Sequence, residues 1–188
     1  LVEKVGGPSV KPYQPEGLWA AVSYDGNLKY QQDLGDALYR RSMYTFWKRT
    51  IPPPAMASFD APTREICTVK RSQSNTPLQA LVLWNDIQFV EAARATAARV
   101  LLETPQAQRV VDLYRRCTGA TPSLGLQRAM ADTLARFETR YSGDPEAAAA
   151  LCGVGDAPIP EGMNTDQLAA WTMLANAVLS SDAAIVKD

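Results

Sequence analysis

Histidine is absent from the 188 residues of this chain. Its absence excludes Ser–His–Asp and Cys–His catalysis, histidine general bases and imidazole metal ligands. It equally excludes the Cys-x-x-Cys-His motif that attaches haem to a protein. Any chemistry that the chain performs must therefore use other side chains.

Cysteine is scarce as well, with Cys67, Cys117 and Cys152 and no Cys-x-x-Cys pair. Structural zinc sites use closely spaced ligand pairs, so this spacing does not favour one. The spacing neither requires nor excludes a single disulfide, and we interpret the three residues as reduced, buried thiols. We expect no metal and no cofactor in this segment.

Neither sign of charge dominates, because 19 Lys and Arg residues are balanced by 20 Asp and Glu residues. A chain with a net charge of −1 has no overall attraction to nucleic acid or to an anionic membrane, so any basic binding site must be local. No run of about 20 apolar residues occurs, and we expect no membrane span. The first residues show neither a signal peptide nor an initiating methionine, so we interpret the chain as part of a longer protein.

Hydrophobic residues make up 46% of the chain, and their spacing predicts a mainly α fold with a buried core. Residues 1–32, rich in Gly, Pro and Tyr, are predicted to form an extended segment that packs on the domain through Trp19. Residues 33–75 are predicted to form one helix and a Pro-rich irregular connection. Residues 76–188 are predicted to form a bundle of about six helices, and we expect 33–188 to be one domain.

The helix in the first half is predicted over residues 34–49. Apolar side chains recur at helical spacing within it: Leu38, Tyr39, Met43, Phe46 and Trp47. Three consecutive prolines at 52–54 end this helix, because proline cannot continue one.

Helix-start signals are frequent after residue 75. Thr76, Pro77 and Gln79 are predicted to form a capping box with proline in the first turn. Asn85–Asp86 is predicted to end one short helix and cap a long one. The remaining helices are predicted to begin at Thr104–Pro105, Thr121–Pro122, Asp144–Pro145, and Asn164 or Thr165.

The densest cluster of bases and aromatics lies between residues 40 and 49: Arg40, Arg41, Tyr44, Trp47, Lys48 and Arg49. Such a cluster can bind phosphate, carboxylate or nucleic acid. An amphipathic helix with an aromatic core stripe and an ion-paired basic face produces the same pattern, and we favour that interpretation. The acids expected to face these cations are Asp60, Glu65 and Asp86.

The irregular connection carries further charges at Asp60, Arg64, Glu65, Lys70 and Arg71. Asp60 and Glu65 could serve as the paired carboxylates of glycoside chemistry, but spacing within a loop does not define their separation. We favour a network of salt bridges that holds the connection in place. Irregular connections of this length are nonetheless often functional.

Three stretches of the sequence resemble a known family. They are GGPSVKPYQPEGLW, LYRRSMYTFWKRTIPPPAMASFDAPTREICTVKRSQSNTPLQALVLWNDIQFVEAARATAARVL and LAAWTMLANAVLSSDAAIVK. Together they are similar to the PSD1 domain, also called DUF1553. The similarity is most specific over residues 39–102, looser over 105–162, and specific again from Leu168. We interpret the chain as the C-terminal part of that domain.

The resemblance indicates the type of protein and its location, but no catalytic activity, because PSD1 has no established activity or catalytic residues. It implies a planctomycete-type, exported, multidomain protein that often carries a cytochrome c-like haem domain upstream. An extracytoplasmic location, in the periplasm or the cell envelope, is implied with it.

Three functional hypotheses result. The first is a helical interaction module without catalytic activity of its own, which docks on upstream domains of the same polypeptide. The alternative is a domain that binds or processes polysaccharide through these residues: Tyr39, Tyr44, Trp47, Trp84, Asp60 and Glu65. Nucleic-acid binding through Arg40–Arg49 is the least favoured, because the net charge and export argue against it.

Overall fold

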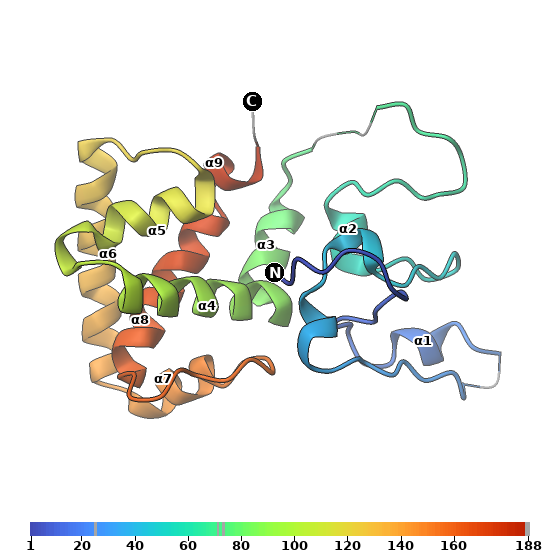
Figure 1. Cartoon of the computed structure of the whole chain (residues 1–188), viewed down its shortest axis with the longest axis horizontal. Coiled ribbons are helices and arrows are strands. Elements are labelled where there is room, and N and C mark those ends of the chain that lie inside the picture. The colour runs from blue at the N-terminus through green and yellow to red at the C-terminus, as the bar shows by residue number, and fades with distance from the viewer. Residues whose placement is uncertain (25, 71, 73, 187–188) are drawn as a thin grey trace. The chain divides into compact units, whose positions relative to one another are not determined.

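The computed structural model describes residues 1–24, 26–70, 72 and 74–186. Two compact units are formed by Leu1–Ser74 and Asn75–Asp188. Within the described residues every regular element is a helix, and strand-like pairing is limited to isolated bridges (Figure 1). The prediction of a mainly α fold is confirmed.

The helical unit, Asn75–Asp188, is built around α8. Its helices are α3 Pro77–Asn85, α4 Ile87–Glu103, α5 Arg109–Thr118, α6 Leu124–Ser142, α7 Pro145–Cys152, α8 Thr165–Leu179 and α9 Asp182–Ile185. α8 packs against α4, α5, α6 and α7, and so forms the centre of the bundle (Figure 1). Of the helices that the structure describes in this unit, six have eight or more residues, as predicted.

The composition of α8 explains its central position. Ala169, Ala170 and Ala175 are fully buried, and such small side chains let neighbouring helices approach closely. Leu174 and Trp171 fill the remaining space, and Thr172 and Asn176 are buried as well. Nine of the fifteen residues of α8 are buried, as is typical of an interior helix. The same core includes Ala93, Ala97, Val100, Leu113, Met130, Leu134, Tyr141, Ala148 and Cys152. No helix in the described part of the chain is both long enough and apolar enough to cross a lipid bilayer.

Most of the predicted helix starts are confirmed. The Thr76 hydroxyl accepts from the Gln79 N–H at 3.3 Å, and the Gln79 side chain accepts from the Thr76 N–H at 3.1 Å. These two bonds complete the predicted capping box of α3. Asp86, Asp144 and Asn164 cap α4, α7 and α8, as their positions predicted. Caps are local features, which is why the sequence reveals them.

Two predicted starts are wrong by a few residues. After Thr104 the chain first makes a short 3₁₀ turn, and α5 begins only at Arg109. Ser123 caps α6 in place of Thr121. The Thr121 hydroxyl instead accepts hydrogen bonds from the Arg115 guanidinium, at 3.2 and 3.1 Å. The hydroxyl predicted to cap α6 is therefore engaged by an arginine of the preceding helix.

Replacing Thr76 with alanine should lower the free energy of unfolding of the helical unit by about 1 kcal/mol, because the first turn of α3 loses its cap. Urea denaturation followed by circular dichroism measures this change. Thr96→Ala is the control, since the Thr96 hydroxyl only donates to the Ala92 carbonyl within α4 and alanine is the better helix former. Equal losses in the two variants would contradict the capping role.

The N-terminal unit, Leu1–Ser74, has little regular structure. It contains two short helices, α1 Leu18–Ala21 and α2 Pro54–Ser58, neither of which was predicted. Proline at the first position of α2 favours that turn of helix. Trp19 of α1 is buried, with its ring edge-on to Tyr30 at 5.2 Å between centroids. Trp19 thus holds α1 against Tyr30 within the N-terminal segment.

The helix predicted over residues 34–49 is wrong. Two 3₁₀ turns, Gly35–Tyr39 and Ser42–Tyr44, occupy this stretch, with extended backbone between them. The Val10 N–H donates to the Tyr44 carbonyl at 2.8 Å, and the Phe46 N–H donates to the Val10 carbonyl at 2.7 Å. Backbone groups that a helix would have paired internally are satisfied by a distant segment instead.

Because this helix is not formed, its predicted apolar and basic faces are not formed either. Met43 is 71% exposed and Phe46 is 37% exposed, so the predicted apolar stripe is not formed, although Leu38 is buried. The basic face predicted for this helix is not formed either, because no helix spans residues 34–49. Aromatic and β-branched residues fit extended backbone well, and here this preference outweighs the helical spacing.

Candidate functional site

The Arg40 side chain holds the N-terminal segment in place. Its guanidinium lies 3.9 Å from the centroid of the Tyr44 ring and donates to the carbonyls of Lys4 and Gly6 at 2.9 and 2.8 Å. The Tyr44 hydroxyl accepts from the Gly6 N–H at 2.9 Å. Gly7 has a φ of 93°, and a Cβ there would lie 3.7 Å from Arg40 Nη1. Arg40 and Tyr44 are therefore engaged with backbone of their own unit.

Arg49 and Glu65 form an ion pair on the surface of the same unit. Arg49 Nε donates to Glu65 Oε1 at 2.8 Å, and Arg49 Nη2 donates to the second carboxylate oxygen. The contact lowers the pKa of the Glu65 carboxyl and raises the pKa of Arg49. A glycosidase general acid needs a raised pKa, so this arrangement argues against that role for Glu65.

Three more of the candidate cations belong to the same unit. Arg64 stacks its guanidinium over the Trp47 ring, 4.5 Å from the centroid. Lys48 Nζ lies 4.7 Å from the centroid of the Trp19 ring. Arg41 is exposed. Four candidate cations thus lie against aromatic rings or a carboxylate: Arg40, Lys48, Arg49 and Arg64.

The other candidate acids make local contacts. Asp60 has a φ of 57°, and its carboxylate accepts from the N–H and the hydroxyl of Ser74 at 2.8 and 2.7 Å. This contact joins the two ends of the irregular connection between Asp60 and Ser74. Asp86 caps α4 by accepting from the Gln88 N–H, and burial raises the pKa of its carboxyl. Arg71 lies outside the described residues.

All three cysteines are free. Cys152 is buried and Cys117 is half-buried, and burial raises the pKa of both thiols, that of Cys117 to about 11. Both thiols therefore stay protonated and unreactive at neutral pH. Cys67 is exposed, so the prediction of three buried thiols is wrong for this residue.

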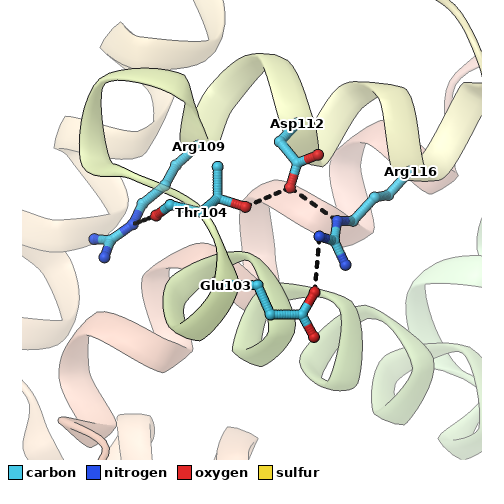
Figure 2. Close-up of polar contacts among 5 residues, drawn as sticks. All are labelled: Glu103, Thr104, Arg109, Asp112 and Arg116. Carbon is cyan, nitrogen blue, oxygen red and sulfur yellow. Dashed lines mark hydrogen bonds and ion pairs between the residues drawn. The ribbon is translucent and has the colours of Figure 1, made fainter.

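Sequence reasoning missed a polar network where the end of α4 meets α5 (Figure 2). Arg116 bridges two carboxylates, with Nη2 at 2.9 Å from Glu103 and Nε donating to Asp112 at 2.8 Å. The Thr104 hydroxyl donates to the same Asp112 oxygen at 2.5 Å, and Arg109 donates to the Thr104 carbonyl at 3.1 Å. The only signal in the sequence was the i, i+4 spacing of Asp112 and Arg116.

This network lines a pocket of about 510 Å³. Its lining residues are Glu103, Thr104, Pro105, Ala107, Gln108, Val111, Asp112, Arg115 and Arg116. Both carboxylates of the lining are paired with Arg116, so the charges are largely neutralised within the chain. The arrangement suits a fixed corner between two helices better than a site for a charged ligand.

Replacing Asp112 with asparagine should make the stability of the helical unit less dependent on pH in acid. Hydrogen bonds from Thr104 and then Arg116 hold the pKa of the Asp112 carboxyl below its ordinary value of 3.8. A lowered pKa contributes stability that is complete above the ordinary pKa and is lost as the pH falls through the lowered value.

The free energy of unfolding of the unchanged chain should therefore fall below about pH 4, and part of that fall should be missing in Asp112→Asn. Urea denaturation between pH 2 and pH 7 measures the difference. Asp132→Asn, at an exposed position of α6, controls for the change of charge. Indistinguishable pH profiles for Asp112→Asn and the unchanged chain would contradict this role of the network.

α3 has one buried side and, opposite to it, a row of exposed apolar side chains. Gln79 and Leu83 are buried against the rest of the unit. Leu78, Leu81 and Trp84 lie on the other side and are 56%, 59% and 36% exposed. At about 100° per residue these three positions span an arc of about 120°. Exposed apolar side chains gathered on one side of a helix often mark a contact with another surface, so this row is the strongest candidate for a binding surface.

Comparison with known families assigns the chain to one of them. The profile of PSD1, described as a protein of unknown function (DUF1553), matches residues 1–134. The chain belongs to the PSD1 family. The match includes the N-terminal unit, α3, α4 and α5, and it ends inside α6, so the similarity noted from Leu168 lies beyond it. Comparisons with curated proteins and with solved structures find no match.

PSD1 membership supplies no activity, since the family is described as one of unknown function. It does place the apolar row of α3 and the polar network between α4 and α5 inside the matched region. Both features therefore belong to the PSD1 part of the chain.

Proposed function

We propose that this PSD1 chain is a helical interaction module, and that another folded surface covers the exposed side of α3. The row formed by Leu78, Leu81 and Trp84 carries the proposal. Full burial of one leucine side chain contributes about 1.5–3 kcal/mol, so three apolar side chains can anchor a complex. Such residues, clustered on one side of a helix, are typical anchors of helix recognition.

The partner we propose is the upstream part of the same polypeptide. The PSD1 resemblance supports this choice, because it implies an exported multidomain protein with a cytochrome c-like domain upstream. In that setting the module would hold its neighbouring domain in a fixed position outside the cytoplasm. Interfaces between domains of one chain resemble moderate protein–protein interfaces, which suits a small apolar row.

Titration calorimetry between this chain and the separately expressed upstream region tests the proposal. We expect saturable binding that Leu81→Ser weakens by roughly tenfold or more, because burial of that side chain is lost. Leu124→Ser is the matched control, since Leu124 is 72% exposed on α6, outside the row. Absence of binding between two folded pieces, or equal weakening by both variants, would sink the proposal.

The polysaccharide alternative has little support at the residues from which it was predicted. One face of the Tyr44 ring is covered by Arg40, and one face of the Trp47 ring is covered by Arg64. The pKa of Glu65 is shifted away from the value that an acid catalyst needs. We therefore do not assign glycan processing to these residues.

A further inference from the structure

A second pocket, of about 530 Å³, lies within the N-terminal unit. Two segments enclose it, residues 14–20 around α1 and residues 28–32. Its side chains are of the mixed kind that small-molecule sites show, with apolar walls and several polar groups. The volume falls within the range of about 300–1,000 Å³ that is usual for such sites.

The aromatic part of the lining is held rigid by contacts inside the unit. Trp19 Nε1 donates to the Gln14 side-chain oxygen at 2.9 Å, and the Tyr30 hydroxyl donates to the Pro12 carbonyl at 2.5 Å. Burial, assisted by the charge of Asp33, raises the pKa of Tyr30 to about 12, so the phenol remains a donor. Neither ring has to be reordered when a ligand enters.

The polar part of the lining has hydrogen-bonding capacity to spare. The Gln14 amide uses its oxygen on Trp19, which leaves its nitrogen as a donor. Glu16 and Lys29 are exposed, and neither takes part in an ion pair among the described residues. The carboxylate of Glu16, the ammonium of Lys29 and the amides of Gln14 and Gln32 therefore border the same pocket as two aromatic rings.

We propose that this pocket binds one ring of a neutral saccharide. The apolar C–H face of a sugar ring packs on the half-buried Tyr30 ring, and its neighbouring hydroxyls pair with amide, carboxylate and ammonium groups. Trp19 is buried, with Lys48 against its ring, and supports the Tyr30 ring from behind. The charges of Glu16 and Lys29 cancel, which disfavours a strongly anionic or cationic ligand. None of the aromatics first considered for sugar binding contributes here: Tyr39, Tyr44, Trp47 and Trp84.

Titration of the full chain with cellohexaose, maltohexaose and mannohexaose tests the proposal. At least one of these neutral oligosaccharides should bind saturably and change the tryptophan fluorescence. Glu16→Ala and Lys29→Ala should each weaken that binding by roughly tenfold, which corresponds to the loss of one charged hydrogen bond. Because both side chains are exposed, the midpoint of thermal unfolding should stay the same.

Glu3→Ala and Lys4→Ala are matched controls, since both side chains are exposed in the same unit and neither lines the pocket. Binding in these two variants should equal that of the unchanged chain. Three results would overturn the proposal. They are no saturable binding of any of the three sugars up to about 10 mM, binding that Glu16→Ala and Lys29→Ala leave unchanged, or a preference for trigalacturonate over the neutral sugars.

Discussion

Replacing Arg94 with methionine should lower the free energy of unfolding of the helical unit by about 3–5 kcal/mol. Arg94 and Glu91 on α4 form a buried ion pair 3.6 Å apart, and each side chain is only 4% exposed. Arg94 also donates to the Ala157 carbonyl at 2.7 Å, while Glu91 Oε1 accepts from the Ala157 N–H at 2.6 Å. The variant would leave a buried carboxylate without its cation.

Urea denaturation of Arg94→Met measures this loss, with Arg99→Met as the control at an exposed position of the same helix. The double variant Glu91→Gln, Arg94→Met should regain part of the loss, because it removes the unpaired charge. A loss in Arg94→Met no larger than that in Arg99→Met would show that the buried pair and its contacts with Ala157 do not stabilise the unit.

Replacing Gly155 with alanine should lower the free energy of unfolding by about 3 kcal/mol, for two reasons that act together. Gly155 has a φ of 85°, a conformation that disfavours any side chain. A Cβ at this position would also lie 2.4 Å from Glu91 Oε1, so the carboxylate would have to leave its place beside Arg94.

Gly119 provides a close control for this prediction. Its φ of 78° matches that of Gly155, but a Cβ there would meet nothing within 4 Å. Gly119→Ala, at the end of α5, should therefore show the backbone cost alone, about 1 kcal/mol. If the two variants lose the same stability in urea denaturation, the close approach to Glu91 contributes nothing.

The helical unit follows closely from its sequence because its signals are local. The capping box at Thr76, the cap at Asp144 and the glycine that ends α5 at Gly119 involve residues a few positions apart. Such signals need no knowledge of the rest of the fold. They define most of the helix boundaries that the structure has.

The N-terminal unit could not be predicted in the same way. Its stretch 34–49 has helical spacing, but its backbone bonds to residues near Val10, more than 30 positions away. The buried ion pair of Glu91 and Arg94 could not be predicted from the sequence for a similar reason. Its surroundings are completed by Ala157, which lies 63 positions beyond Arg94. Sequence spacing carries no information on such distant contacts.

The candidate site, too, could be predicted from the sequence only in part. The sequence analysis named Glu65 among the acids expected to face the cations of residues 40–49, and Arg49 is one of these cations. The exposure of Leu78 and Leu81 could not be predicted, because an apolar residue at helical spacing has the same pattern whether another element covers it or not. Only the arrangement of α3 against the bundle reveals that one apolar side of this helix faces outward.

Hydroxyl-radical labelling of the chain, alone and with the upstream region of its polypeptide, tests the interaction module most directly. Leu78, Leu81 and Trp84 should be modified readily in the chain alone. In the complex we expect their modification to fall toward that of Trp171, which is 4% exposed, while that of Leu124 stays unchanged. A complex in which the three residues of α3 remain as reactive as before would contradict the proposed role of this surface.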